Sequence, residues 1–148
     1  MRILVVDDDA DFRALIHESM PGGVDVTTCH SSMEALRLVS SAGTNRFELA
    51  LVDLNMAPHL ASRPECEGIA LARRLIDGPH SAAVILVSSE RSVAPSRENG
   101  TIGVVGCLKK PIDLNRLARF VTSFGELLCD ERTSPDDFEV GGSRERGS

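Results

Sequence analysis

The sequence is poor in aromatic residues and has no excess of basic residues, the two kinds from which nucleic-acid-binding surfaces are built. It has no tryptophan and no tyrosine, and aromatic residues make up only 3% of the chain. The 22 acidic residues outnumber the 16 lysines and arginines, which gives a net charge of −6 at pH 7. Nucleic-acid binding needs a basic stripe and stacking rings. We therefore expect no nucleic acid among the partners.

Long apolar runs and paired cysteines are also missing. No run approaches the roughly 18 apolar residues of a membrane span, and the N-terminus has no secretory apolar region. The chain has four scattered cysteines without a CxxC pair: Cys29, Cys66, Cys107 and Cys129. This usage is typical of reduced thiols, most of them buried. We expect a cytoplasmic protein with no membrane attachment and no cysteine metal site.

Short β-branched runs alternate with stretches of helical spacing along the chain. The runs lie at 2–6, 24–28, 48–53, 83–88 and 104–108. Three of them are almost continuously apolar, as in parallel strands that are covered on both faces. Five strands alternating with five helices predict a doubly wound α/β fold, with a parallel sheet and helices on both faces.

Apolar stripes and capping residues predict the helices. Asp9, Ser31 or Ser32, and Asp113 each precede a periodic stretch and are good N-caps. The apolar stripes are Phe12, Leu15, Ile16 and Met20; Met33, Leu36 and Val39; Ile69, Leu71, Ala72, Leu75 and Ile76; and Leu114, Leu117, Phe120, Val121 and Phe124. A further helix within 89–103 would be short, because Pro95, Gly100 and Gly103 interrupt it.

The length and composition of the chain predict one domain followed by a polar tail. Its 148 residues suit a single domain, which we place at 1–128. Residues 129–148 contain little that could build a core, so we expect a disordered tail there. This tail is too short for a DNA-binding or catalytic output domain.

Polar residues follow four of the five predicted strands. Asp7 and Asp8 follow the first strand, Asp53 ends the third, Ser88 ends the fourth and Lys110 follows the fifth. Carboxyl ends of parallel strands form one edge of a sheet, where ligands bind. Crowded carboxylates repel one another unless a cation lies between them, and oxygen ligands suit Mg²⁺. Lysine and serine are natural partners of phosphoryl oxygens.

The segments "VVDDD", "LVDLNM", "ILVSS" and "LKKP" resemble, in the right order, the four signature segments of response-regulator receiver domains of two-component signal transduction. The resemblance covers about residues 1–128. It implies a stand-alone receiver with the flavodoxin-like, chemotaxis-regulator-like sheet of strand order 2-1-3-4-5.

The resemblance also implies a role for each matching residue. Asp53 would accept a phosphoryl group from a sensor histidine kinase, a phosphotransfer protein or a small acyl phosphate. Asp8, Asp53 and the backbone carbonyl of Asn55 would hold Mg²⁺, with Asp7 acting mainly through a water molecule. Lys110 would pair with Asp53 before the reaction and with the phosphoryl group after it.

Further implications concern the switch. Ser88 would hydrogen-bond a phosphoryl oxygen, and the bond between Lys110 and Pro111 is a candidate for the cis form. Such a protein is not an enzyme in the usual sense. It catalyses its own phosphorylation and dephosphorylation, and thereby switches an interaction with a downstream protein.

Three departures from the family pattern bear on that output. The fourth helix, which is often the signalling surface in the family, is interrupted by Pro95 and Gly100. Cys107 lies three residues before Lys110, where the family usually has an aromatic switch residue. The segment "APHLASRPECEG" makes the loop after Asp53 about seven residues longer than usual before its matching glycine, Gly68. Long loops of this kind often carry partner contacts.

Two other functions fit part of the pattern. "VVDDDAD" also suits a Mg²⁺-dependent phosphatase of the haloacid-dehalogenase type, with Asp7 as nucleophile and Asp9 as acid. That assignment leaves Asp53 unexplained. A receiver-like interaction module that is never phosphorylated is the second alternative, and the intact acidic set disfavours it.

Overall fold

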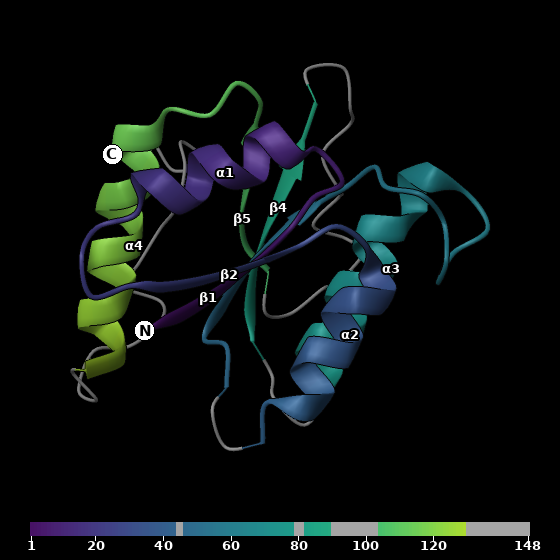
Figure 1. Cartoon of the computed structure of the whole chain (residues 1–148), viewed down its shortest axis with the longest axis horizontal. Coiled ribbons are helices and arrows are strands. Elements are labelled where there is room, and N and C mark those ends of the chain that lie inside the picture. The colour runs from purple at the N-terminus through teal and green to yellow at the C-terminus, as the bar shows by residue number, and fades with distance from the viewer. Residues whose placement is uncertain (44–45, 79–81, 90–103, 130–148) are drawn as a thin grey trace.

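The computed structural model describes residues 1–43, 46–78, 82–89 and 104–129. Five strands form one parallel sheet in the order β2-β1-β3-β4-β5. Helices α1 and α4 cover one face of the sheet, and α2 and α3 cover the other (Figure 1). The predicted doubly wound, flavodoxin-like fold and its strand order are therefore confirmed.

The observed elements lie close to the predicted ones. The strands are β1 (Arg2–Val6), β2 (Asp25–Cys29), β3 (Leu49–Asp53), β4 (Ala83–Ser88) and β5 (Val104–Lys109). The helices are α1 (Ala10–Ser19), α2 (Ser32–Ser41), α3 (Pro64–Asp77) and α4 (Leu114–Cys129). None of the helices in the described ranges is long and apolar enough to cross a membrane.

The three central strands are buried on both faces, which explains their continuous apolar runs. Along β1, Leu4 and Val6 pack on the side of α2 and α3, whereas Ile3 and Val5 pack on the side of α1 and α4. Successive side chains of a strand point to opposite faces, so a strand covered twice must be apolar throughout. Because the central strands are packed on both faces, their carboxyl ends are fixed side by side at one edge of the sheet.

The predicted caps are present. Asp9 accepts hydrogen bonds from the N–H groups of Asp11 and Phe12 at 3.0 and 3.4 Å. Ser31, not Ser32, is the N-cap of α2 and accepts the Glu34 N–H. Asp113 accepts the Arg116 N–H at 3.2 Å at the start of α4. Each cap satisfies backbone donors that the first turn leaves without a partner.

Two residues assigned to apolar stripes do not face the core. Leu15 is 46% exposed and Met33 is 45% exposed. On α1 the core contacts come from Phe12 and Ile16, which are four residues apart and share one face. Leu15 is one residue away from Ile16, about 100° around the helix axis, and so it turns toward solvent.

The expectation that most cysteines are buried is wrong for the described thiols. Cys29 is buried, Cys66 is half-buried and Cys107 is exposed. Cys107 lies on β5, which pairs only with β4 among the described strands and forms an edge of the sheet. An edge strand is covered less completely than a central one.

The long loop after Asp53 is shorter in the structure than in the prediction. Helix α3 already begins at Pro64, so the last five of the twelve residues of the segment, Pro64 to Gly68, are helical. Proline suits the first helical position because its φ is preset and its missing N–H costs nothing there. The predicted helix within 89–103 falls almost wholly outside the described residues. The predicted tail at 129–148 does so except for Cys129, which is the last residue of α4.

Candidate functional site

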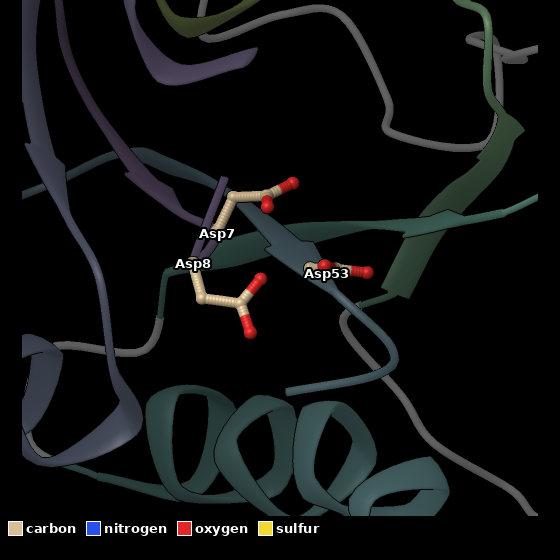
Figure 2. A group of neighbouring side chains, drawn as sticks. All are labelled: Asp7, Asp8 and Asp53. Carbon is tan, nitrogen blue, oxygen red and sulfur yellow. The ribbon is translucent and has the colours of Figure 1, made fainter. Parts of the chain in front are cut away.

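The sheet edge brings together the three carboxylates that the sequence singled out. One oxygen each of Asp7, Asp8 and Asp53 lies within 4.8 Å of the other two. Asp7 and Asp8 leave the end of β1 in different directions, and Asp53 lies beside them at the end of β3 (Figure 2). Two neighbouring parallel strands thus supply one acidic cluster.

Lys110 joins this cluster from the end of β5. Its Nζ atom lies 2.8 Å from Asp7 Oδ2 and 4.0 Å from Asp53 Oδ2. The resemblance implied a pair with Asp53, but the short hydrogen bond goes to Asp7. The ammonium also lies 4.3 Å from the centre of the Phe12 ring, which is a favourable cation–π contact.

The structure holds Asp7 firmly. Its side chain is 1% exposed, and Oδ1 accepts the Asp9 N–H at 2.9 Å. Arg13 donates from Nη1 to the backbone carbonyl of Asp7 at 2.7 Å. Sequence reasoning missed both Arg13 and Phe12. The available signal was their position in the first turn of the helix that directly follows the acids.

Asp53 is 7% exposed and accepts the Asn55 N–H at Oδ1, at 3.2 Å. Burial, followed by the negative charge of Asp7, raises the pKa of Asp53 from 3.8 to about 7. Lys110 and the Asn55 N–H oppose this shift, and Asp8 adds to it. A buried acid with so high a pKa is easily stabilised by an added cation.

Lys110 remains an ammonium in this setting. Desolvation lowers the pKa of Lys110, but the hydrogen bond and charge of Asp7, together with Asp53, raise it overall. When all three acids are ionised, three negative charges therefore face one positive charge. Hard oxygen ligands with excess negative charge are the donor set that Mg²⁺ takes, so the residues fit this ion.

The comparisons with known proteins agree with this geometry. The family model of the response regulator receiver domain matches residues 3–122, which is most of the chain. The chain belongs to the response regulator receiver domain family. The receiver has relatives of modest similarity among both curated proteins and solved structures.

Two curated relatives and one structure illustrate this. The receiver is 27% identical over 135 residues to the sensor histidine kinase RcsC of Escherichia coli (strain K12), covering 90% of this chain and 13% of RcsC. It is 28% identical over 138 residues to the response regulator MprA of Mycobacterium avium (strain 104), covering 93% of this chain and 54% of MprA. The receiver domain of a Francisella response regulator aligns with a TM-score of 0.66 and 25% identity, over 84% of this chain and 96% of that one. The chain thus spans about half the length of MprA and a much smaller part of RcsC.

The remaining signature residues occupy matching places in the receiver. Ser88 is buried at the end of β4, and its carbonyl accepts the Lys110 N–H at 2.8 Å. The bond between Lys110 and Pro111 is cis, as the resemblance implied. Asp9 is engaged as the cap of α1, which speaks against a role as the acid of a phosphatase. A contact of Ser88 with a phosphoryl group stays a prediction.

Gly68 fixes how α3 meets the site. Its N–H donates to the carbonyl of Leu54 at 3.1 Å. A Cβ atom at this position would lie 2.3 Å from the carbonyl oxygen of Asp53 and 2.5 Å from Leu54 Cα. Only glycine allows this approach, so the start of α3 lies directly against the backbone of Asp53.

Proposed function

We propose that this receiver accepts a phosphoryl group on Asp53 and thereby switches a protein–protein interaction. One observation carries the proposal: the buried Asp53 carboxylate lies within 4.8 Å of oxygens of Asp7 and Asp8, at an edge that also holds Lys110. The donor would be a phosphohistidine on a sensor histidine kinase or phosphotransfer protein. RcsC and MprA are named a sensor histidine kinase and a response regulator, which supports this pairing.

Magnesium would be the cofactor. Asp7, Asp8 and Asp53 supply carboxylate oxygens from the cluster, and the backbone carbonyl of Asn55 follows Asp53 by two residues. When bound, the ion neutralises charge where a phosphate anion approaches a carboxylate. Asp7, already held by Lys110 and by the Asp9 N–H, would act through a water molecule.

The chemical step uses the ionised form of Asp53. A carboxylate oxygen attacks phosphorus in line with the leaving group, so a new oxygen–phosphorus bond forms. The bond from phosphorus to the imidazole of the donor, or to the acyl oxygen, breaks, and its electron pair leaves with that group. The Lys110 ammonium and the Ser88 hydroxyl donate hydrogen bonds to phosphoryl oxygens.

Loss of the phosphoryl group resets the switch. Water attacks phosphorus, the bond to Asp53 breaks, and the carboxylate is restored. The protein is both catalyst and substrate of these two steps, so it works as a self-modifying switch and does not turn over a separate substrate. We place it in the cytoplasm, where a kinase phosphohistidine would meet it and where its scattered thiols stay reduced.

Acyl-phosphate labelling tests the proposal. In Mg²⁺, the wild-type chain should take up about one phosphoryl group, and Asp53→Asn should take up none, because an amide is not a nucleophile. Asp25→Asn is the matched control, since that carboxylate is exposed at the start of β2 and pairs with Arg2. Mass spectrometry of the trapped acyl phosphate locates the modified residue.

The labelled position decides between the three functions. Label at Asp53 supports the receiver reaction, and label at Asp7 would indicate a phosphatase-type nucleophile. A folded wild-type chain that takes up no label would indicate the third function, an interaction module that is not phosphorylated. Stoichiometric labelling of Asp53→Asn at another aspartate overturns the proposal.

A further inference from the structure

Glu67 is a buried acid that the phosphorylation reaction does not use. It lies in the first turn of α3 and is 0% exposed. Within the described residues, no ion pair joins it to a lysine, arginine or histidine. Burial of a carboxylate without a cation is costly unless hydrogen-bond donors surround it. The structure supplies those donors from the segment that follows Asp53.

Three consecutive backbone N–H groups bind this carboxylate. Oε1 accepts from His59 and Leu60 at 2.9 Å and from Ala61 at 3.0 Å, and Leu60 also lies 3.1 Å from Oε2. Successive N–H groups that converge in this way form an anion-binding nest. Here the anion belongs to the protein itself, so Glu67 holds the middle of the segment in one conformation.

Ser32 of α2 also lies near the carboxylate. Its hydroxyl is wholly buried and makes no hydrogen bond of good geometry among the described residues, yet it lies close enough to influence Glu67. Burial alone would raise the pKa of Glu67, but Ser32 and the three N–H donors outweigh burial and lower it. The carboxylate is thus ionised and well satisfied.

The same segment carries the expected metal-binding carbonyl. Its start is tied to the sheet, because Leu54 donates to Val87 at 2.8 Å and accepts from Gly68 at 3.1 Å. Its end joins α3, where the Pro64 carbonyl accepts the Met56 N–H at 3.4 Å. Between these ties lie the three residues that Glu67 binds, and Asn55 is four residues before the first of them.

We infer that Glu67 is a positioning residue for the phosphorylation site: by binding the N–H groups of residues 59–61, it holds the segment 54–63, and with it the Asn55 carbonyl, in the place that binds the cation. This inference rests on the proposed function. If an apolar side chain replaced Glu67, the three N–H donors would lose their acceptor, and the segment would rearrange so that they could hydrogen-bond to water.

A loosened segment must be ordered again when the cation binds. Fixing one residue of backbone costs about as much free energy as a tenfold change in affinity. Glu67→Met keeps the length of the side chain and removes both acceptors. We expect it to weaken Mg²⁺ binding about tenfold, measured by calorimetry on the full chain, and to speed hydrogen exchange of the His59, Leu60 and Ala61 amides.

Two further variants separate positioning from general stability. Glu67→Gln keeps an oxygen where Oε1 accepts all three bonds. It should bind Mg²⁺ within about threefold of wild type. Leu75→Ala opens a cavity under the same helix, away from the carboxylate, and should lower stability with unchanged Mg²⁺ affinity.

A measurement on the wild-type chain removes the dependence on any variant. If an ordered segment favours Mg²⁺, then Mg²⁺ must order the segment by the same factor. Saturating Mg²⁺ should therefore slow exchange of the three amides, and unchanged exchange overturns the inference even if Glu67→Met does not fold. Wild-type affinity in a folded Glu67→Met overturns it as well. A wild-type chain that takes up no Mg²⁺ contradicts the proposed function instead.

Discussion

Asp53 and Glu67 are two buried carboxylates at the two ends of one segment, and their surroundings shift them in opposite directions. Asp53 is 7% exposed, and burial together with Asp7 raises its pKa to about 7. Glu67 is 0% exposed, yet its pKa is lowered, because N–H groups and Ser32 outweigh burial. Burial is therefore not what distinguishes them.

The difference lies in what faces each pair of oxygens. Three backbone donors converge on Glu67, so its charge is already stabilised by the fold. Asp53 instead faces two other carboxylates, and its ammonium neighbour lies 4.0 Å away and bonds to Asp7. An acid that the fold satisfies holds structure in place. An acid whose charge the fold leaves poorly stabilised gains most from a bound cation.

The largest expected effect comes from a steric clash between α3, which carries Glu67, and the end of β3, which carries Asp53. Gly68→Ala would place a Cβ atom against the backbone of Asp53 and Leu54, which cannot yield as a flexible side chain does. We expect a loss of about 3 kcal/mol or more in the free energy of unfolding, measured by urea denaturation. Gly125→Ala is the matched control.

That control lies in the interior of α4, where a new Cβ would meet only Met1 Sδ at 3.6 Å. Alanine is favoured over glycine in a helix by up to about 1 kcal/mol, so this variant should be neutral or more stable. Equal losses in the two glycine variants would show that the contact between α3 and β3 is not tight.

Removing each acid should change stability in opposite directions. At pH 8 with EDTA, Glu67→Met should lose about 2 kcal/mol, because three buried donors lose their acceptor. Under the same conditions, Asp53→Asn should gain on the order of 1 kcal/mol, because it removes a charge that burial and Asp7 disfavour. Urea denaturation of both variants beside wild type measures this. Changes of the same sign would contradict the comparison.

The smallest expected effect is a pH dependence without metal. The folded pKa of Asp53 is about 7 against an ordinary value of 3.8, so the folded state holds a proton that the unfolded state releases. Its contribution to stability is complete below about pH 4 and is lost as the pH rises through 7. We expect stability in EDTA to fall over this range.

Glu67 should affect the folding stability at acidic pH. Its lowered pKa stabilises the fold above the ordinary value of 4.5, and that contribution is lost as the pH falls through the folded pKa. Asp53→Asn should flatten the fall toward pH 7, and Glu67→Gln should flatten the loss in acid. Melting temperatures across pH 3 to 8 distinguish them. A fall toward pH 7 that persists in Asp53→Asn would assign it to another group.

The sequence by itself determined the sheet and the edge at which the acidic residues meet. Continuous apolar runs predicted the central strands because a strand covered on both faces must be apolar at every position. Acids placed directly after β1 and at the last position of β3 had to meet, since parallel strands end at one edge. Caps such as Asp9 were predictable because their hydrogen bonds reach only two or three residues along the chain.

Tertiary structure alone decided which partner each charged group takes. Lys110 is 103 residues from Asp7, and whether its ammonium bonds to Asp7 or Asp53 depends on differences of about 1 Å that spacing does not contain. Glu67 lies in the segment that the sequence predicted to be a long loop. It is buried because Gly68 brings α3 against the end of β3 and the preceding backbone then folds over the carboxylate. Local patterns fix elements, whereas the partner of a long side chain is fixed only when distant elements pack together.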